Sequence, residues 1–287
     1  MKFSLICVTY GRTDEVDRFL HSLQCQDSSD FEIIIIDQNQ DNKIEHLVTK
    51  YNQTCLIRHV RVDFNNNTRA RNLGIRLAKG EWIAFPDDDC WYDERLLTEL
   101  ANRIQHQPNV GGFFVNWADP LQEEKKIMFP ASTGQMLKKE LFEYAACICL
   151  FFRTDVLKQF GGFNEKLGLG DDTLAKAGEE QELLFRLFDN NISIHKALDL
   201  FVFHRINNRI WNSYFEQRVL GSGATDFYLI SKHFGLFNGL KTLLLWTGGY
   251  CYNLVRQRIQ YRKWYYLKLK GAFLLSGKLK YEPSRFN

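Results

Sequence analysis

The sequence predicts an α/β fold with a doubly wound, mostly parallel sheet, helices on both faces and a helical C-terminal extension. Two observations support this prediction. Short apolar runs alternate with amphipathic segments along the N-terminal third of the chain, which is the pattern of βαβ units joined by right-handed crossovers. Residues 33–36 are four consecutive isoleucines, and continuous β-branched runs are typical of parallel strands that are covered on both faces.

The expected elements follow one another in a regular order. We expect strands at 3–8, 31–36, 57–62 and 82–85, helices at 14–23, 44–51, 68–78 and 96–104, and a later strand at 198–203. The first helix is amphipathic and opens with acidic residues, which are favoured at helix N-termini. In a sheet of this kind, ligands bind beyond the carboxyl ends of the strands. We therefore expect the functional site at that edge.

Charge divides the chain into two parts. The chain has 287 residues, of which 45% are hydrophobic, enough for one large core with an accessory segment. From Arg209 onward there are 13 Lys and Arg against 3 Asp and Glu, which leaves 24 against 31 for the preceding residues. We expect a body at 1–208, with halves at 1–117 and 118–208, and a basic aromatic tail at 209–287. The tail's net positive charge predicts an anionic partner, either phospholipid or a phosphorylated substrate.

Three consecutive aspartates, Asp87, Asp88 and Asp89, come directly after the apolar strand at 82–85. Like charges repel at a dry strand end, so a cationic partner is expected there. Carboxylate oxygens suit Mg²⁺ or Mn²⁺, which proteins often hold with one or two carboxylates and the phosphates of a substrate. The triplet therefore predicts a metal and diphosphate site. The alternative interpretation is a solvated turn or a cap for the helix at 96–104.

Five sequence blocks carry a family resemblance. They are residues 4–12, 32–39, 69–75 and 85–89, and the pair 161–165 with 178–187. In order and spacing they resemble glycosyltransferase family 2, the inverting branch of the GT-A nucleotide-sugar transferases, over about the first 205 residues. The resemblance implies a GT-A fold and transfer of a sugar from a nucleoside diphosphate to a glycan acceptor.

The resemblance also implies roles for individual residues. Contacts with the donor, a UDP-sugar, are implied for Thr9, Tyr10, Asp37, Arg71, Asp87 and Asp88, and the metal, Mn²⁺ or Mg²⁺, for Asp89 and His204. Weaker acceptor contacts are expected at Glu179, Gly170, Asp171 and Trp117. A divalent cation would neutralise charge on the departing nucleoside diphosphate. The alternatives are that the histidine is structural and that the tryptophan belongs to the core.

Inverting transfer requires a general base that takes the proton of the acceptor hydroxyl. Alignment on the family's G-E-D block implies Glu180 for this role, where the family more commonly has an aspartate, and Glu179 is the second choice. Burial would have to raise the pKa of the base toward neutrality. The alternative is that these glutamates only favour the start of a helix, as acidic residues do.

The basic tail allows several interpretations. Residues 238–270 interleave aromatic and aliphatic side chains with Lys and Arg, a composition that suits an interfacial helix on anionic lipid. We expect this helix to break or bend at Gly248 and Gly249. A helical hairpin packed on the body and a dimer interface are the alternatives. A membrane contact would fit an acceptor linked to a polyprenyl diphosphate, as in capsule or O-antigen assembly by relatives.

The cysteines and the N-terminus bear on the location of the protein. The seven cysteines are scattered, and no leader pattern precedes the first strand, so we expect a cytoplasmic protein, with the tail on the inner face of the cell membrane if it binds lipid. Three rival functions are less consistent with the sequence. A nucleotidyltransferase would have a Gly-rich phosphate loop near the first strand, and residues 9–12 provide none. An inactive scaffold would not need an intact acidic motif. The acidic body argues against nucleic acid. The sugar, the linkage and the oligomeric state are not encoded in any motif.

Overall fold

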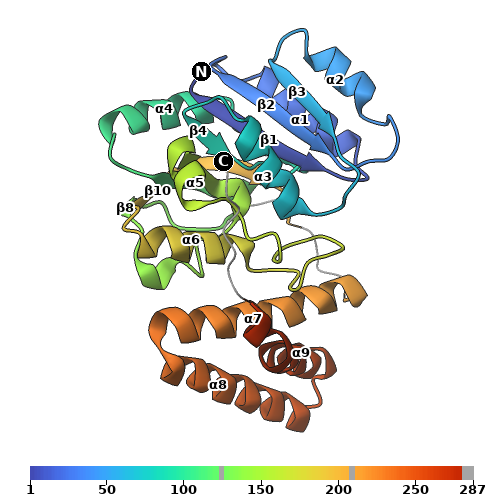
Figure 1. Ribbon diagram of the computed structural model, residues 1–287, viewed down its shortest axis with the longest axis vertical. Coiled ribbons are helices and arrows are strands. Elements are labelled where there is room, and N and C mark those ends of the chain that lie inside the picture. Colours follow the sequence, from blue (N-terminus) through green and yellow to red (C-terminus); the bar gives the residue numbers. More distant parts are fainter. Residues whose placement is uncertain (123–125, 207–210, 280–287) are drawn as a thin grey trace.

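The computed structural model describes residues 1–122, 126–206 and 211–279. Its centre is one mixed sheet with helices packed around it, and a separate group of helices lies at one end (Figure 1). The strands are β1 (Phe3–Thr9), β2 (Phe31–Asp37), β3 (Ile57–Arg61), β4 (Trp82–Ala84), β5 (Cys90–Tyr92), β6 (Gly112–Asp119), β7 (Lys126–Ile127), β8 (Thr133–Gln135), β9 (Leu150–Arg153) and β10 (Ile194–His204). Their main order in the sheet is β3-β2-β1-β4-β9-β6-β10-β5.

The N-terminal part of the sheet is parallel, as the sequence predicts. Strand β1 lies between β2 and β4, and β2 also pairs with β3. The isoleucines at 33–36 on β2 are completely buried, because helices cover both faces of these strands. The expected strands at 3–8, 31–36, 57–62 and 82–85 are confirmed within one or two residues.

The second part of the sheet contains the antiparallel pairs. Strand β9 pairs antiparallel with both β4 and β6, and β10 runs parallel to β6 but antiparallel to β5 and β8. Strand β6 runs through the boundary expected between residues 117 and 118. Both halves of the body therefore contribute to the same sheet.

The helices of the body pack against these strands. They are α1 (Asp14–Gln24), α2 (Glu45–Tyr51), α3 (Asn67–Leu77), α4 (Leu96–His106), α5 (Thr154–Phe160) and α6 (Glu179–Asp189), with short 3₁₀ turns at 138–140 and 147–149. Helix α3 packs on β1 and β2, and α4 packs on β10. Helix α3 is capped by Asn66, whose side chain accepts a hydrogen bond from the backbone of Arg69. This cap fixes the start of the helix that carries Arg71.

The tail forms a helical module of α7 (Ser213–Phe234), α8 (Leu236–Val255) and α9 (Ile259–Leu275), followed by a short turn at 276–278. The three helices pack against one another, and α7 also packs on α6. Lys268 is buried within the module, where its ammonium group pairs with Asp226 and lies 5.2 Å from the ring centre of Trp246 and 5.1 Å from that of Trp264. The cation–π contacts and the ion pair offset the desolvation of this buried charge.

The break or bend expected at Gly248 and Gly249 is not a break, because α8 runs through both residues to Val255. The chain turns at residues 256–258 instead, where Gln257 has a φ of 53°. Gly249 has a packing role: a Cβ atom there would lie 2.4 Å from Cζ of Tyr265 on α9. The glycine therefore allows α8 and α9 to approach closely. Within the described ranges, no helix combines the length and the apolar character required to cross a bilayer.

Candidate active site

Three polar strand ends meet at one edge of the sheet. Thr9 ends β1 and Asp37 ends β2, and the two residues are partners in the parallel register. Asp87 follows β4 and forms a parallel bridge with Val8. The pairing register of these parallel strands therefore brings residues from three distant segments together, as the sequence predicts.

Asp88 is the most enclosed member of the aspartate triplet. It is 4% exposed, its Oδ2 accepts a hydrogen bond of 2.7 Å from Thr9 Oγ1, and its Oδ1 pairs with the guanidinium of Arg12. Burial raises the pKa of Asp88 from 3.8 to about 6, although Arg12 and Thr9 act in the opposite direction. The site thus holds a carboxylate whose charge is poorly compensated in this structure.

Asp89 pairs with two groups. Its Oδ1 lies 3.3 Å from His204 Nε2, and its Oδ2 lies 2.9 Å from Arg12 Nη2. Burial alone would raise the pKa of Asp89, but the hydrogen bond and charge of His204 and the charge of Arg12 hold it below its ordinary value. The hydrogen bond to Asp89 raises the pKa of His204. His204 ends β10 and Asp89 directly precedes β5, so the antiparallel pairing of these strands brings the two residues together.

The donor set of Asp89 and His204 fits a divalent cation. Two neighbouring ligands of an octahedral Mg²⁺ at about 2.1 Å each lie about 3 Å apart, and the closest polar atoms of Asp89 and His204 are 3.3 Å apart. Across 1–122, 126–206 and 211–279, no group of three or more His, Cys, Asp or Glu side chains could hold a metal ion. Phosphate oxygens of a bound substrate and water commonly supply the other ligands of such ions.

Arg71 connects the triplet with the start of α6. The residue is 5% exposed, its Nη2 donates a hydrogen bond of 3.0 Å to Asp87 Oδ1, and its Nη1 lies 3.6 Å from Glu179 Oε1. Nη1 has no hydrogen-bond partner among the described residues. Its guanidinium also lies over the ring of Phe163, 5.4 Å from the ring centre. The side chain is therefore held in place, and its buried Nη1 lacks a hydrogen-bond partner among the described residues.

The structure distinguishes the two candidate bases. Glu179 is buried beside Arg71 and faces its positive charge. Glu180, the next residue on α6, is half-buried, and among the described residues its carboxylate forms no ion pair and no hydrogen bond with another side chain. Burial of its carboxylate raises the pKa of Glu180 well above its ordinary value, the charge of Glu179 adds to this, and Arg71 opposes it. An unpaired carboxylate with a raised pKa has the properties of a general base.

Asp37 is enclosed by its own neighbours. Its Oδ2 lies 2.9 Å from His59 Nε2, and its Oδ1 accepts hydrogen bonds from the backbone and the side chain of Asn39. Burial alone would raise the pKa of Asp37, but these hydrogen bonds outweigh it and lower the pKa. Tyr10, in contrast, is 58% exposed, so its ring is free to contact a ligand at this edge.

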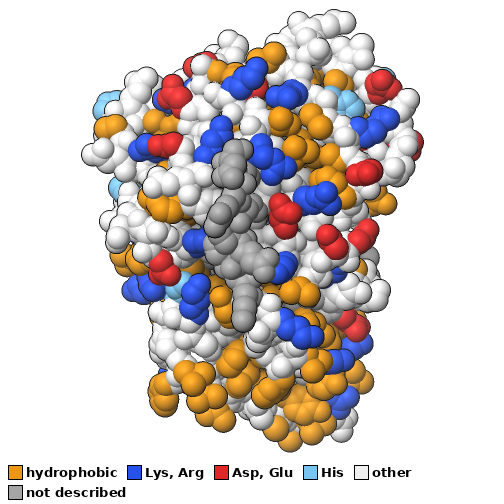
Figure 2. Space-filling view, viewed as in Figure 1, with side chains coloured by type: hydrophobic (Ala, Val, Ile, Leu, Met, Phe, Trp, Pro, Cys, Tyr) orange, Lys and Arg blue, Asp and Glu red, His pale blue; other side chains and the backbone are white. Residues whose placement is uncertain are grey.

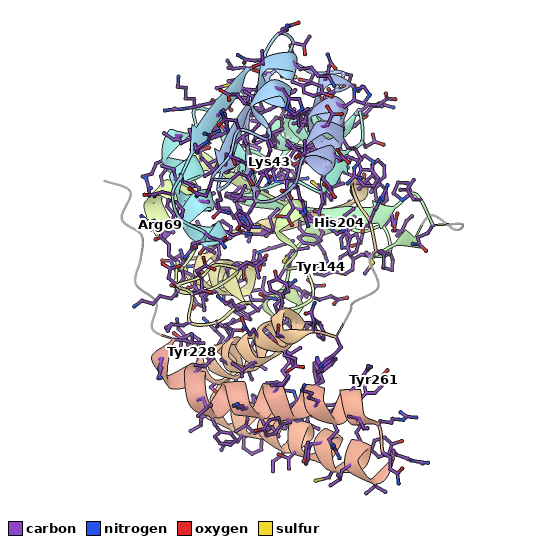
Figure 3. The ribbon with its side chains drawn as sticks, turned by 90° about the vertical axis from the view of Figure 1, so that its right-hand side faces the viewer. Lys43, Arg69, Tyr144, His204, Tyr228 and Tyr261 are labelled. Atoms are coloured by element: carbon purple, nitrogen blue, oxygen red, sulfur yellow. The ribbon has the colours of Figure 1, made fainter. Side chains whose placement is uncertain are left out.

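The residues expected to contact the acceptor lie in three places, the first of which is the start of α6, with Glu179. Gly170 and Asp171 lie in a loop fastened to the chain before α3: Gly170 pairs with Asn66, and Asp171 Oδ1 accepts a hydrogen bond of 3.2 Å from Asn65. Trp117 lies on β6 with its ring in edge contact with His204, 5.7 Å between centres. Figure 3 shows His204 on the side of the body that faces away from Arg69.

Sequence reasoning missed two site residues. Arg12 pairs with both Asp88 and Asp89, and His59 contacts Asp37. Both positions carried a signal that could have been used, because Arg12 follows the first strand at its carboxyl end and His59 lies on the strand next to Asp37. Their partners could not be inferred, since these contacts depend on how distant segments meet.

The chain is similar to a family model and to several known proteins. A family model described as "Glycosyl transferase family 2" matches residues 4–161. The poly(ribitol-phosphate) beta-N-acetylglucosaminyltransferase TarP of Staphylococcus aureus is 25% identical over 211 residues, 70% of this chain and 62% of that protein. The GalNAc(5)-diNAcBac-PP-undecaprenol beta-1,3-glucosyltransferase of Campylobacter jejuni is 26% identical over 144 residues, 48% of this chain and 44% of that protein. The chain thus spans less than two thirds of the length of either relative.

Solved structures share the fold. S. aureus TarS 1–349 in complex with UDP-GlcNAc superposes with a TM-score of 0.60 at 19% identity, covering 80% of this chain and 67% of that one. The mannosyltransferase PcManGT of Pyrobaculum calidifontis, in complex with GDP-Man and Mn²⁺, has a TM-score of 0.63 at 13% identity, covering 97% of this chain and 88% of that one. These likenesses confirm the GT-A fold. The family match covers more than half of the residues, and the chain therefore belongs to glycosyltransferase family 2.

Proposed function

We propose that this protein is an inverting glycosyltransferase that moves a sugar from a UDP-sugar to a glycan acceptor. The observation that supports this most is the contrast between two carboxylate groups near Arg71. The aspartate triplet is held by cations at the edge of the sheet, while Glu180 keeps an unpaired carboxylate with a raised pKa at the start of α6. The aspartate triplet would serve the charged donor, and Glu180 would accept the proton.

In the proposed reaction, Glu180 removes the proton from an acceptor hydroxyl as its oxygen attacks the anomeric carbon of the donor sugar. A new C–O bond forms on the face opposite the leaving group, the bond from the sugar to the diphosphate breaks, and the nucleoside diphosphate departs with the electron pair. The raised pKa of Glu180 favours acceptance of the proton. Glu179 is a weaker candidate because its carboxylate already pairs with the guanidinium of Arg71, 3.6 Å away.

The donor would lie along the strand ends. The residues that would contact it are Thr9, Tyr10, Asp37, Arg71, Asp87 and Asp88. The guanidinium of Arg71 would add positive charge beside the anionic donor. Asp89 and His204 would hold Mn²⁺ or Mg²⁺, which would supply neutralisation of the charge that grows on the leaving diphosphate. UDP-GlcNAc in a solved neighbour supports a uridine donor, and Mn²⁺ in another supports the metal.

The acceptor would be a glycan on a polyprenyl diphosphate, in the assembly of a surface polysaccharide such as capsule or O-antigen. A relative whose name specifies an undecaprenol-linked acceptor supports this class. Trp117, Gly170, Asp171 and Glu179 would contribute the acceptor side. The protein would act in the cytoplasm, and residues 238–270 would touch the inner face of the cell membrane.

The first experiment is calorimetry of UDP binding with and without Mn²⁺, on the wild type and Asp89→Asn. Metal-dependent binding that the substitution removes is expected. Glu180→Gln should then bind UDP as the wild type does and transfer no sugar from UDP-sugars, with Glu143→Gln, an exposed glutamate of the body, as the matched control. Retained turnover in Glu180→Gln contradicts the assignment of the base. No nucleotide binding under any metal condition would favour an inactive scaffold, and cleavage of the donor between its phosphates would favour a nucleotidyltransferase.

A further inference from the structure

The helical module has a strongly one-sided charge. Between Asp226 and Glu282 the chain contains no Asp or Glu, while residues 227–281 contain 10 Lys and Arg. This span covers the end of α7 and all of α8 and α9. A segment of this length without any acidic residue cannot compensate its own charge, so it generates a positive potential over its surface.

Helix α8 presents an apolar stripe to the outside. Phe237, Leu240, Leu244 and Val255 recur at spacings that place them on one face of the helix. Phe237 is 80% exposed, Leu244 is 73% exposed and Val255 is 81% exposed. Ile259, at the beginning of α9, is also exposed, at 67%. We call these five residues the α8 face. Contiguous exposed apolar side chains of this kind mark an interaction surface.

The α8 face lies at the end of the molecule that is farthest from the sheet. Helix α8 forms the outer edge of the helical module in Figure 1, and Figure 2 shows hydrophobic side chains gathered over this end, with Lys and Arg beside them. Figure 3 places Tyr228 and Tyr261 in the module, below the level of His204. The stripe is therefore accessible along its length of about 30 Å, the rise of a 20-residue helix.

Cations flank the α8 face. Lys241 is exposed on α8 between Leu240 and Leu244, and Arg256 and Arg258 are exposed at the turn into α9. No ion pair of these three residues occurs in the part of the chain that the structure describes. Their positive charges are free to meet an anionic surface beside the apolar stripe.

We propose that the α8 face docks on an anionic phospholipid bilayer, with α8 lying in the plane of the headgroups. Apolar side chains that enter the interface, next to cations that meet lipid phosphates, are two features of an interfacial helix. A second copy of the chain fits less well, because pairing this face with itself would bring Lys241, Arg256 and Arg258 against equivalent cations with no acidic partner on α8 or α9. Nucleic acid would match the cations but leave the aliphatic side chains in water.

Membrane docking rests on the proposed function, because the lipid-linked acceptor of that function makes a bilayer the relevant partner. The module is packed on the catalytic body at α6: a Cβ atom at Gly178, which directly precedes Glu179, would lie 2.5 Å from Cβ of Thr225 on α7. Docking through α8 would therefore hold the start of α6 in a fixed orientation to the bilayer. This orientation suits an acceptor whose polyprenyl chain is embedded in the same membrane.

The test is cosedimentation of the full chain with vesicles, without nucleotide or metal. Vesicles of phosphatidylcholine alone are compared with vesicles that also contain phosphatidylglycerol. The variant is Leu244→Glu, which places a charge in the centre of the stripe at an exposed position. The control is Leu56→Glu, because Leu56 is a leucine of similar exposure, 62%, on the catalytic body. UDP binding and light scattering are measured on all three proteins.

The wild type and Leu56→Glu should bind vesicles that contain phosphatidylglycerol. The affinity of Leu244→Glu for these vesicles should be lower by about tenfold or more, because burial of one leucine contributes at least that factor. Binding should fall as salt rises. Equal binding by Leu244→Glu and Leu56→Glu, or no binding to anionic vesicles, overturns the inference. A wild-type dimer that Leu244→Glu converts to a monomer, without vesicle binding, assigns the face to a second copy and also overturns it. Vesicle binding without UDP binding supports the docking surface and refutes the proposed function.

Discussion

Asp88 should make the folded protein less stable as pH rises. Its carboxyl loses the proton near 3.8 in the unfolded chain but near 6 in the folded one, so the folded state binds the extra proton between these values. The free energy of unfolding should therefore fall through this window. Raising a pKa from 3.8 to about 6 corresponds to a loss of about 3 kcal/mol. Asp88 is only 4% exposed, so solvent screening reduces this value little.

The perturbation is Asp88→Asn, which keeps the shape of the side chain and cannot titrate. Urea unfolding in the presence of a chelator measures the free energy of unfolding of both proteins at about pH 5 and about pH 8. Between these two conditions the wild type should lose about 1.4 kcal/mol more than the variant, because part of the effect lies below pH 5. Asp41→Asn, at an exposed aspartate, should behave as the wild type. Equal pH dependence in wild type and Asp88→Asn would refute the reasoning.

Three further predictions concern other contacts. Arg12→Gln should tighten the binding of Mn²⁺ alone by about tenfold in calorimetry, because it frees an oxygen of Asp89 from a competing cation; unchanged affinity contradicts the prediction. Gly178→Ala should lower the free energy of unfolding by about 2 kcal/mol or more in urea, because its φ is 91° and the added methyl group would overlap Thr225. Lys268→Met should lower the free energy of unfolding by about 2 to 4 kcal/mol, because the carboxylate of Asp226 loses its cation. Unchanged stability of this variant would contradict the buried ion pair.

Much of the site could be predicted because it depends on local patterns. The isoleucine run at 33–36 and the alternation of strands and helices determined the parallel part of the sheet, and strand ends in such a sheet share an edge. Thr9, Asp37 and Asp87 therefore had to lie near one another. The resemblance to a family added the roles of these residues, and the family match supports the assignment of the chain.

The partners of each charge could not be predicted. Thr9 and Asp88 are 79 residues apart in the chain, and Arg12 and Asp88 are 76 residues apart. Their contacts depend on the register of β1 with β4, which no sequence window contains. The same holds for the distinction between Glu179 and Glu180: both are acidic residues at the start of one helix, but the ion pair with Arg71 from α3 is made by Glu179.

By itself, the sequence determined the α/β character of the body, the order of its N-terminal elements, the acidic strand end and the positive charge of the tail, because hydrophobic periodicity and local composition are properties of short segments. The tertiary structure alone decided that β9 inserts antiparallel beside β4, that α8 continues through Gly248 and Gly249, and that Lys268 is buried while the α8 face is exposed. These outcomes depend on the packing energies between segments that are far apart in the chain. A glycine that permits a bend and a glycine that admits a neighbouring ring are identical until the neighbour, here Tyr265, is in place.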